Sequence, residues 1–132
     1  MNSEIVGTWV LVRGEVSNDA GESLSGPYGG EKAMGLVRFN ADGRMMAVLC
    51  DGRPSLPVGA TREYNSYCGN YTFDGKQLTT TVDASAPSIP VGSAQVRDVT
   101  LEGNRLVLRP PARAVGNRLE QRALYWEKIA DI

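Results

Sequence analysis

The stretch Gly7-Thr8-Trp9-Val10-Leu11-Val12, close to the N-terminus, predicts the first strand of a closed antiparallel β-barrel. Successive strand side chains point to opposite faces, so Leu11 shares the face of Trp9 and the two valines share the other. Trp9 is large enough to plug one end of a barrel, and its indole N–H needs a hydrogen-bond partner once it is buried. Gly7 lets the backbone bend or approach a neighbouring strand closely. We therefore expect a strand over residues 5–16 that enters the barrel at its floor.

A series of hairpins follows this strand. We expect an all-β fold, a single antiparallel up-and-down barrel of about eight strands. Beyond the first strand, these cover residues 34–40, 44–50, 63–73, 76–84, 94–101, 105–109 and 119–129, with a further short strand near 22–24. Segments rich in turn-forming residues are expected as loops, at 17–33, 51–62, 85–93 and 112–117. The first of these loops is long enough to lie over a barrel mouth.

The first hairpin has apolar residues on both predicted faces. A two-residue turn at Asp42-Gly43 would place Phe39 opposite Met46 and Val37 opposite Val48. The two predicted faces are Val37, Phe39, Met46, Val48 and Cys50 on one side, and Leu36, Arg38, Met45, Ala47 and Leu49 on the other. A sheet with one face in water alternates more cleanly between apolar and polar residues. The extra apolar face indicates either the lining of a ligand cavity or a contact between copies of the chain.

The second hairpin is predicted to have one apolar and one polar face. A two-residue turn at Asp74-Gly75 would pair Tyr71 with Leu78 and Tyr67 with Val82. The apolar face would then consist of Tyr67, Gly69, Tyr71, Phe73, Leu78, Thr80 and Val82. These assignments depend on register, because a slip by one residue moves every side chain to the opposite face.

The composition fits one domain over residues 1–132 that has neither nucleic-acid nor membrane partners. The formal net charge is -1, and basic residues are scattered among acidic ones, which argues against a nucleic acid or an anionic membrane surface as partner. No apolar run is long enough to cross a bilayer, and the N-terminus does not resemble a signal peptide. We expect a cytoplasmic protein that keeps Cys50 and Cys68 reduced.

The chain contains no histidine. This excludes Ser-His-Asp and Cys-His catalysis and removes the commonest transition-metal ligand. Two distant cysteines do not form a zinc site, and no P-loop or dinucleotide-binding glycine motif is present. We therefore expect neither a metal nor a cofactor. Any chemistry would have to use Asp, Glu, Tyr, Lys, Arg or Cys.

Several motifs together resemble the bacterial and fungal lipocalin-like domain family. They are the first strand at 7–12, the hairpin at 35–45, Tyr67-Cys68-Gly69-Asn70-Tyr71 and Gln95-Val96-Arg97. The resemblance covers nearly the whole chain and implies an antiparallel barrel of the calycin type. Members of the family often have histidine in the strand after the Asp74-Gly75 turn, where this chain has threonines. The resemblance therefore implies no histidine-based function here.

The two ends of the chain are also similar to those of the intracellular fatty-acid-binding proteins. The matching residues are Gly7-Thr8-Trp9 at the start and Trp126-Glu127-Lys128 at the finish. Those proteins place two helices directly after the first strand, whereas residues 17–33 lack helical periodicity and are rich in Gly and Ser. The lipocalin-like domain family is therefore the better match.

Two arginines are candidates for ligand binding. Arg97 shares a predicted strand face with Val99 and Leu101, and Arg122 shares one with Leu124 and Trp126. An arginine among inward-facing apolar residues needs an anion or another acceptor, and guanidinium can bind a carboxylate through two parallel hydrogen bonds. Interior arginines serve the ligand carboxylate in fatty-acid-binding proteins, and Arg97 lies at a comparable place. The alternative is a structural arginine that stacks on Trp9 or pairs with an acidic residue.

Aromatic and apolar side chains complete the predicted site. Tyr67 and Tyr71 share a face with Gly69 between them, which leaves room for a ligand that stacks on the rings or accepts their O–H groups. The other candidate walls are Trp9, Leu11, Phe39, Met46 and Trp126. The alternative for all of these side chains is ordinary core or rim packing.

The pattern favours a barrel that binds a small apolar or amphipathic molecule, with Arg97 and Arg122 holding a polar or anionic end. One alternative is an isomerase or cyclase in which a dry cavity and a Tyr or Arg stabilise developing charge. Another is a structural protein that forms a homodimer through an apolar barrel face. A buried Arg97 that faces a sizeable cavity favours the first two, whereas a filled interior with an apolar outer patch favours the third.

Overall fold

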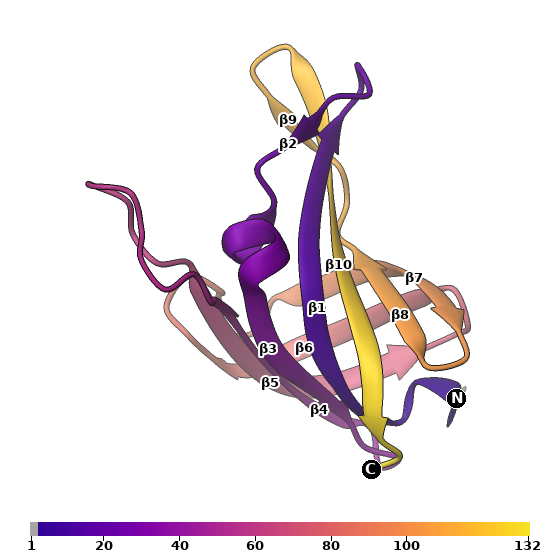
Figure 1. Ribbon diagram of the computed structural model, residues 1–132. Helices are drawn as coiled ribbons and strands as arrows, with labels where there is room; N and C mark the ends of the chain where they lie inside the picture. Colours follow the sequence, from indigo (N-terminus) through magenta and orange to yellow (C-terminus); the bar gives the residue numbers. More distant parts are fainter. Residues whose placement is uncertain (1–2) are drawn as a thin grey trace.

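The computed structural model describes residues 3–132, which form a closed β-barrel (Figure 1). Its strands are β1 (Gly7–Asn18), β2 (Ser23–Leu24), β3 (Ala33–Phe39), β4 (Arg44–Asp51), β5 (Tyr64–Phe73), β6 (Gln77–Ser85), β7 (Ala94–Glu102), β8 (Arg105–Arg109), β9 (Arg113–Val115) and β10 (Arg118–Ala130). Two short 3-10 helices, η1 (Ser3–Ile5) and η2 (Pro27–Lys32), precede β1 and β3. None of the helices in this part of the chain is long and apolar enough to cross a membrane.

Eight of the strands within residues 3–132 close the barrel. Neighbours pair antiparallel in the order β1-β3-β4-β5-β6-β7-β8-β10, and β10 pairs with β1 to complete the ring. Figure 1 shows β1 and β10 extending together beyond the barrel, with β2 and β9 beside their far ends. The predicted fold class is therefore confirmed. The short strand expected near 22–24 lies outside the ring, and the loop expected at 112–117 contains β9.

The floor of the barrel is built around Trp9. This side chain is fully buried, and its indole N–H donates to the carbonyl oxygen of Ile5 at 2.9 Å. Ile5 lies in η1, so the extended strand begins at Gly7 instead of residue 5. A Cβ on Gly7 would lie 2.5 Å from Cε of Lys128 and 2.7 Å from the carbonyl oxygen of Ala130. Glycine is therefore required where the two ends of the chain meet.

The turn of the first hairpin is one residue longer than predicted, which reverses the faces of β4 relative to β3. The Gly43 N–H donates to the carbonyl oxygen of Asn40 at 3.2 Å, and the φ angle of Gly43 is 90°. This is a type I turn followed by a left-handed glycine, which makes a three-residue loop. Phe39 therefore pairs with Met45 instead of Met46. The prediction that Met46 shares the inner face of Phe39 is wrong: Met45 is 3% exposed and Met46 is 63% exposed.

The second apolar face of this hairpin lies on the outside of the barrel. Its exposed residues are Met34, Leu36, Met46 and Val48, and Tyr64 of β5 is exposed beside them. Because β3, β4 and β5 are neighbours in the sheet, these side chains form one outer apolar patch. A homodimer through such a face stays a prediction.

The second hairpin also differs from its predicted register, but by two residues. Its turn lies at Gly75-Lys76, so that Phe73 pairs with Leu78 and Tyr71 with Thr80. A shift by an even number of residues leaves every side chain on its predicted face. Tyr71, Phe73, Leu78 and Thr80 are accordingly all buried inside the barrel.

Candidate ligand-binding site

The interior of the barrel contains a cavity of about 260 Å³. Apolar side chains from β3, β4, β6, β8 and β10 form much of its wall. Its polar lining residues are Tyr28, Asn65, Tyr67, Gln95, Arg97, Arg113 and Arg122. These come from η2, from the starts of β5, β7 and β10, and from β9, which is the end of the barrel opposite to the floor. We refer to this end as the mouth.

Strand register across β7, β8 and β10 separates polar from apolar residues by depth. Two layers cross these strands, the deeper one of Leu101, Leu106 and Trp126 and the next of Val99, Leu108 and Leu124. Two positions further toward the mouth, Arg97 on β7 and Arg122 on β10 also line the cavity. Residues two apart on a strand share a face, so both arginines lie on the same side of the sheet as these two layers. The interior is therefore apolar at depth and carries both predicted arginines near the mouth.

Arg97 lines this cavity without a carboxylate partner. Its Nη1 donates to the carbonyl oxygen of Val96 at 2.8 Å, and its Nη2 donates to Oε1 of Gln95 at 2.7 Å. Both acceptors are neutral, and none of the ion pairs within residues 3–132 includes Arg97. A half-buried guanidinium without a counter-charge favours the binding of an anion.

Tyr67 lies close enough to Arg97 for the charge of that arginine to affect its pKa. Burial raises the pKa of Tyr67, and the positive charge of Arg97 acts in the opposite direction. The net shift is upward, so the phenol is neutral at neutral pH and its O–H can act as a donor. Arg97 and Tyr67 therefore offer donors to the same region of the cavity.

Arg122 has an acidic neighbour but keeps one free donor. Its Nη1 lies 3.7 Å from Oε2 of Glu63, across the mouth. Its Nε is buried and has no hydrogen-bond partner within residues 3–132. The acidic partner that we considered from the sequence therefore exists, but it does not satisfy the whole guanidinium group.

Trp126 presents a second unpaired donor. The side chain is 2% exposed and lines the cavity at its deepest layer. Its Nε1–H is buried and, in the described part of the chain, has no acceptor. A buried N–H without a partner is costly, so a ligand that supplies an acceptor gains from it.

Helix η2 carries Tyr28 to the wall of the cavity. Tyr28 has φ 56° and ψ 35°, a left-handed conformation that is uncommon for a side chain with a Cβ. Its backbone N–H donates to Oε1 of Glu63 at 2.7 Å, and its hydroxyl accepts from Nδ2 of Asn65 at 2.7 Å. Burial also raises the pKa of this tyrosine. These contacts hold Tyr28 in place despite its unfavourable backbone angles.

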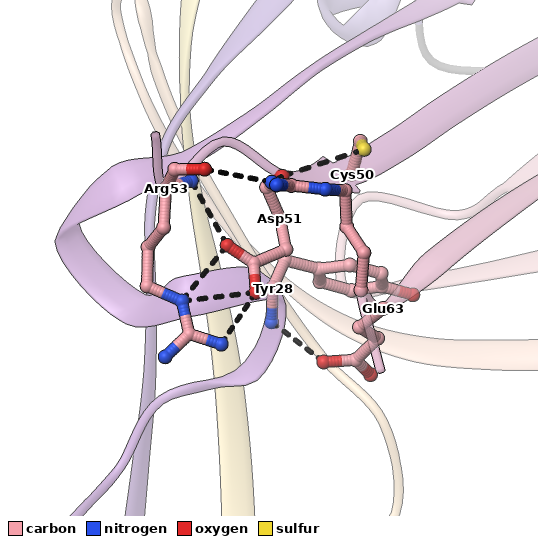
Figure 2. Close-up of polar contacts among 6 residues, drawn as sticks. Tyr28, Cys50, Asp51, Arg53 and Glu63 are labelled. Atoms are coloured by element: carbon pink, nitrogen blue, oxygen red, sulfur yellow. Dashed lines mark hydrogen bonds and ion pairs between the residues drawn. The ribbon is translucent and has the colours of Figure 1, made fainter. Parts of the chain in front are cut away.

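A charged network fixes the rim beside η2 (Figure 2). Asp51 ends β4 and is almost fully buried. Arg53 donates to its carboxylate through Nε at 3.0 Å and Nη2 at 2.6 Å, and these hydrogen bonds lower the pKa of Asp51. A Cβ on Gly29 would lie 2.4 Å from Oδ1 of Asp51, so η2 packs directly on this carboxylate. The rim thereby holds η2, and with it Tyr28, against β4.

The predicted site residues separate into three groups. Those that line the cavity are Phe39, Tyr67, Arg97, Arg122 and Trp126. Trp9 and Tyr71 are buried in the floor and do not border it, and the hydroxyl of Tyr71 donates to the carbonyl oxygen of Asn40 at 2.7 Å. Met46 points outward because of the longer turn.

Sequence reasoning missed four polar residues of the cavity, Tyr28, Asn65, Gln95 and Arg113. Asn65 and Gln95 stand two positions before Tyr67 and Arg97 on the same strands, so strict alternation along these strands would have found both. Tyr28 lies in an irregular turn and has no periodic signal. Among residues 3–132, no group of three His, Cys, Asp or Glu side chains is placed to hold a metal ion.

A closed eight-stranded antiparallel barrel with an interior cavity defines a small calycin-type β-barrel protein. A model of the lipocalin-like domain family matches residues 6–129, and the chain belongs to this family. No curated protein and no solved structure matches the sequence. The resemblance that the sequence motifs indicated is therefore confirmed.

Proposed function

We propose that this barrel binds a small amphipathic molecule with an anionic or strongly polar end. The observation that carries the proposal is Arg97, whose guanidinium borders the cavity and meets only neutral acceptors. The free Nε of Arg122 adds a second donor from a residue that lines the same cavity. The apolar layers below would take the rest of the molecule.

The size of the cavity favours a compact ligand. Its volume of about 260 Å³ lies below the range of about 300–1,000 Å³ that is usual for sites of drug-sized molecules. A molecule of one or two fused rings suits this volume better than a long acyl chain. The proposed ligand is therefore ring-shaped and amphipathic.

Binding of the fluorescent anion anilinonaphthalene sulfonate tests the proposal. The matched variants are Arg97→Gln and Arg38→Gln, because Arg38 lies on the outer face of β3 and donates to Asn40. A charge-assisted hydrogen bond is worth about 1.5–3 kcal/mol, so Arg97→Gln should weaken binding about tenfold or more. Arg38→Gln should bind like the wild type.

Native mass spectrometry of gently purified protein supplies a second measurement. We expect a small molecule that co-purifies with the wild type and with Arg38→Gln and is lost from Arg97→Gln. Equal probe affinity in all three proteins, with no co-purified molecule, would overturn the proposal.

A further inference from the structure

We propose that the ligand carries a neutral oxygen acceptor at its buried end, such as a ketone, and that the indole N–H of Trp126 donates to it. This inference rests on the proposed function and specifies the ligand class. It assigns a polar role to a side chain that would otherwise count only as an apolar wall.

The two tryptophans of the chain show why this donor is notable. The Trp9 N–H is buried and donates to the carbonyl oxygen of Ile5. The Trp126 N–H is equally buried, but no group within residues 3–132 accepts from it. Indole N–H is a donor only, so the missing partner must be an acceptor. Because Trp126 lines the cavity, a ligand can supply that acceptor.

The surroundings of Trp126 favour a neutral acceptor over an anion. Its layer partners, Leu101 and Leu106, are apolar, and the layer above consists of apolar residues as well. A carboxylate at this depth would lose its hydration without gaining a counter-charge. The arginines that can neutralise an anion, Arg97 and Arg122, lie further toward the mouth. A carbonyl oxygen can accept from the indole without that penalty.

A water molecule is a poor substitute for such an acceptor. Buried waters usually make two to four hydrogen bonds to polar groups. The deepest layer offers a water the N–H of Trp126 beside the side chains of Leu101 and Leu106. A ligand oxygen is already attached to an apolar framework and needs only the one bond.

Two polar contacts at different depths define the shape of the ligand. Arg122 and Trp126 are four residues apart on β10, which is about 13 Å between Cα atoms in an extended strand. The side chains of Arg122 and Trp126 occupy part of this distance, and the ligand would occupy the rest. A fused bicyclic framework with an anionic group on one ring and a ketone on the other is the class that we infer.

A pair of probes isolates the ketone. These are a tetralone carboxylate and the tetralin carboxylate that lacks its ketone, compared by isothermal titration calorimetry. Wild-type protein should prefer the tetralone about five- to tenfold, as expected for one buried hydrogen bond. Trp126→Phe should bind both equally. Arg97→Gln should weaken both by the same factor and keep the preference, because it acts only on the carboxylate.

The indole resonances supply a readout that needs no variant. In a proton–nitrogen correlation spectrum, the Trp126 N–H should move downfield with the tetralone and much less with the tetralin. The Trp9 N–H serves as the internal control, because its hydrogen bond to Ile5 is already formed. This measurement therefore tests the inference even if the Trp126→Phe variant does not fold.

The outcomes separate this inference from the proposed function. Equal binding of both probes to the wild type, with no downfield shift of Trp126, would overturn the neutral acceptor and leave the anion-binding barrel standing. Binding of neither probe would overturn the proposed function, and the inference with it.

Discussion

The floor and the cavity of this barrel use the same residue types in opposite ways. In the floor, the Trp9 N–H donates to Ile5 and the Tyr71 O–H donates to Asn40. In the cavity, the Trp126 N–H is buried without an acceptor within residues 3–132. The floor therefore contributes stability, whereas the cavity keeps donors available at a cost of about 1–3 kcal/mol for each unsatisfied group.

Packing follows the same division. Toward the floor, the Phe39 and Tyr71 rings meet edge to face, with their centroids 5.1 Å apart. At the mouth, the cavity is lined by polar side chains that include Arg97 and Arg122. A barrel built only for stability would fill these positions with apolar residues. The difference between the two ends is the feature on which the proposed function rests.

The largest effect that we expect comes from exchanging each tryptophan for phenylalanine. Trp9→Phe should lower the free energy of unfolding by about 2–3 kcal/mol, because it opens a void and leaves the Ile5 carbonyl oxygen without its donor. Trp126→Phe should cost only about 1 kcal/mol, because removal of an unpaired donor offsets part of the lost volume. Urea unfolding followed by circular dichroism measures both. Equal losses in the two variants would contradict the division between floor and cavity.

The second effect concerns Arg97 and separates stability from binding. Arg97→Met removes a half-buried charge that has no carboxylate partner, so the free energy of unfolding should stay constant or rise by up to about 1 kcal/mol. Binding of anilinonaphthalene sulfonate should fall about tenfold or more. A marked loss of stability in thermal unfolding would instead show that Arg97 is a structural arginine.

The sequence was sufficient to predict the barrel because its signal is distributed over many strands. Alternation identified the inner face of the second hairpin even though the turn was misplaced by one residue, since the resulting shift of the register was even. In the first hairpin the loop is one residue longer than predicted, so the register shift is odd and Met46 moves from the inside to the outside. An Asp-Gly pair can adopt the backbone angles of a two-residue loop and those of a three-residue loop. The residues Asp42-Gly43 therefore do not decide the length of the loop.

The candidate site could be predicted only where it lies on regular strands. Arg97 and Arg122 are inward on their strands, and alternation along β7 and β10 places both. That these two arginines line the same cavity follows from the way β8 joins β7 to β10, which no local pattern encodes. The missing acceptor of Trp126 is likewise a property of the packed interior and has no counterpart in the sequence.

The third effect compares the two tyrosines. Tyr71→Phe removes the hydrogen bond to the carbonyl oxygen of Asn40 and should cost about 1 kcal/mol of unfolding free energy. Tyr67 borders the cavity instead of the packed floor, so Tyr67→Phe should leave stability nearly unchanged. Probe affinity should change in the reverse order, with the loss confined to Tyr67→Phe. A destabilised Tyr67→Phe with unaltered probe binding would place Tyr67 among the structural residues.

The smallest effect that we expect is the pH dependence of the rim. The hydrogen bonds from Arg53 lower the pKa of Asp51 in the folded protein below its usual value of 3.8. A carboxyl group whose pKa is lower in the folded than in the unfolded protein stabilises the fold at pH values above its unfolded-state pKa. That stabilisation is lost as the pH falls through the folded-state pKa. Wild-type protein should therefore lose stability below about pH 4 more steeply than Asp51→Asn, which carries no titrating group at this position. The difference should be modest, because the Arg53 side chain is 36% exposed and solvent screens the pair.

Unfolding midpoints in urea between neutral pH and about pH 3 measure this difference. Asp131→Asn is the matched control, because it removes one exposed carboxylate near the C-terminus and leaves the rim intact. The expected result is a flatter acid limb for Asp51→Asn alone. Parallel curves for all three proteins would mean that η2 is held at the rim by packing on Gly29 and Tyr28, as the floor is, and not by charge. The rim would then resemble the floor, and the contrast would remain only between the paired donors of the floor and the Trp126 donor of the cavity, which is unpaired within residues 3–132.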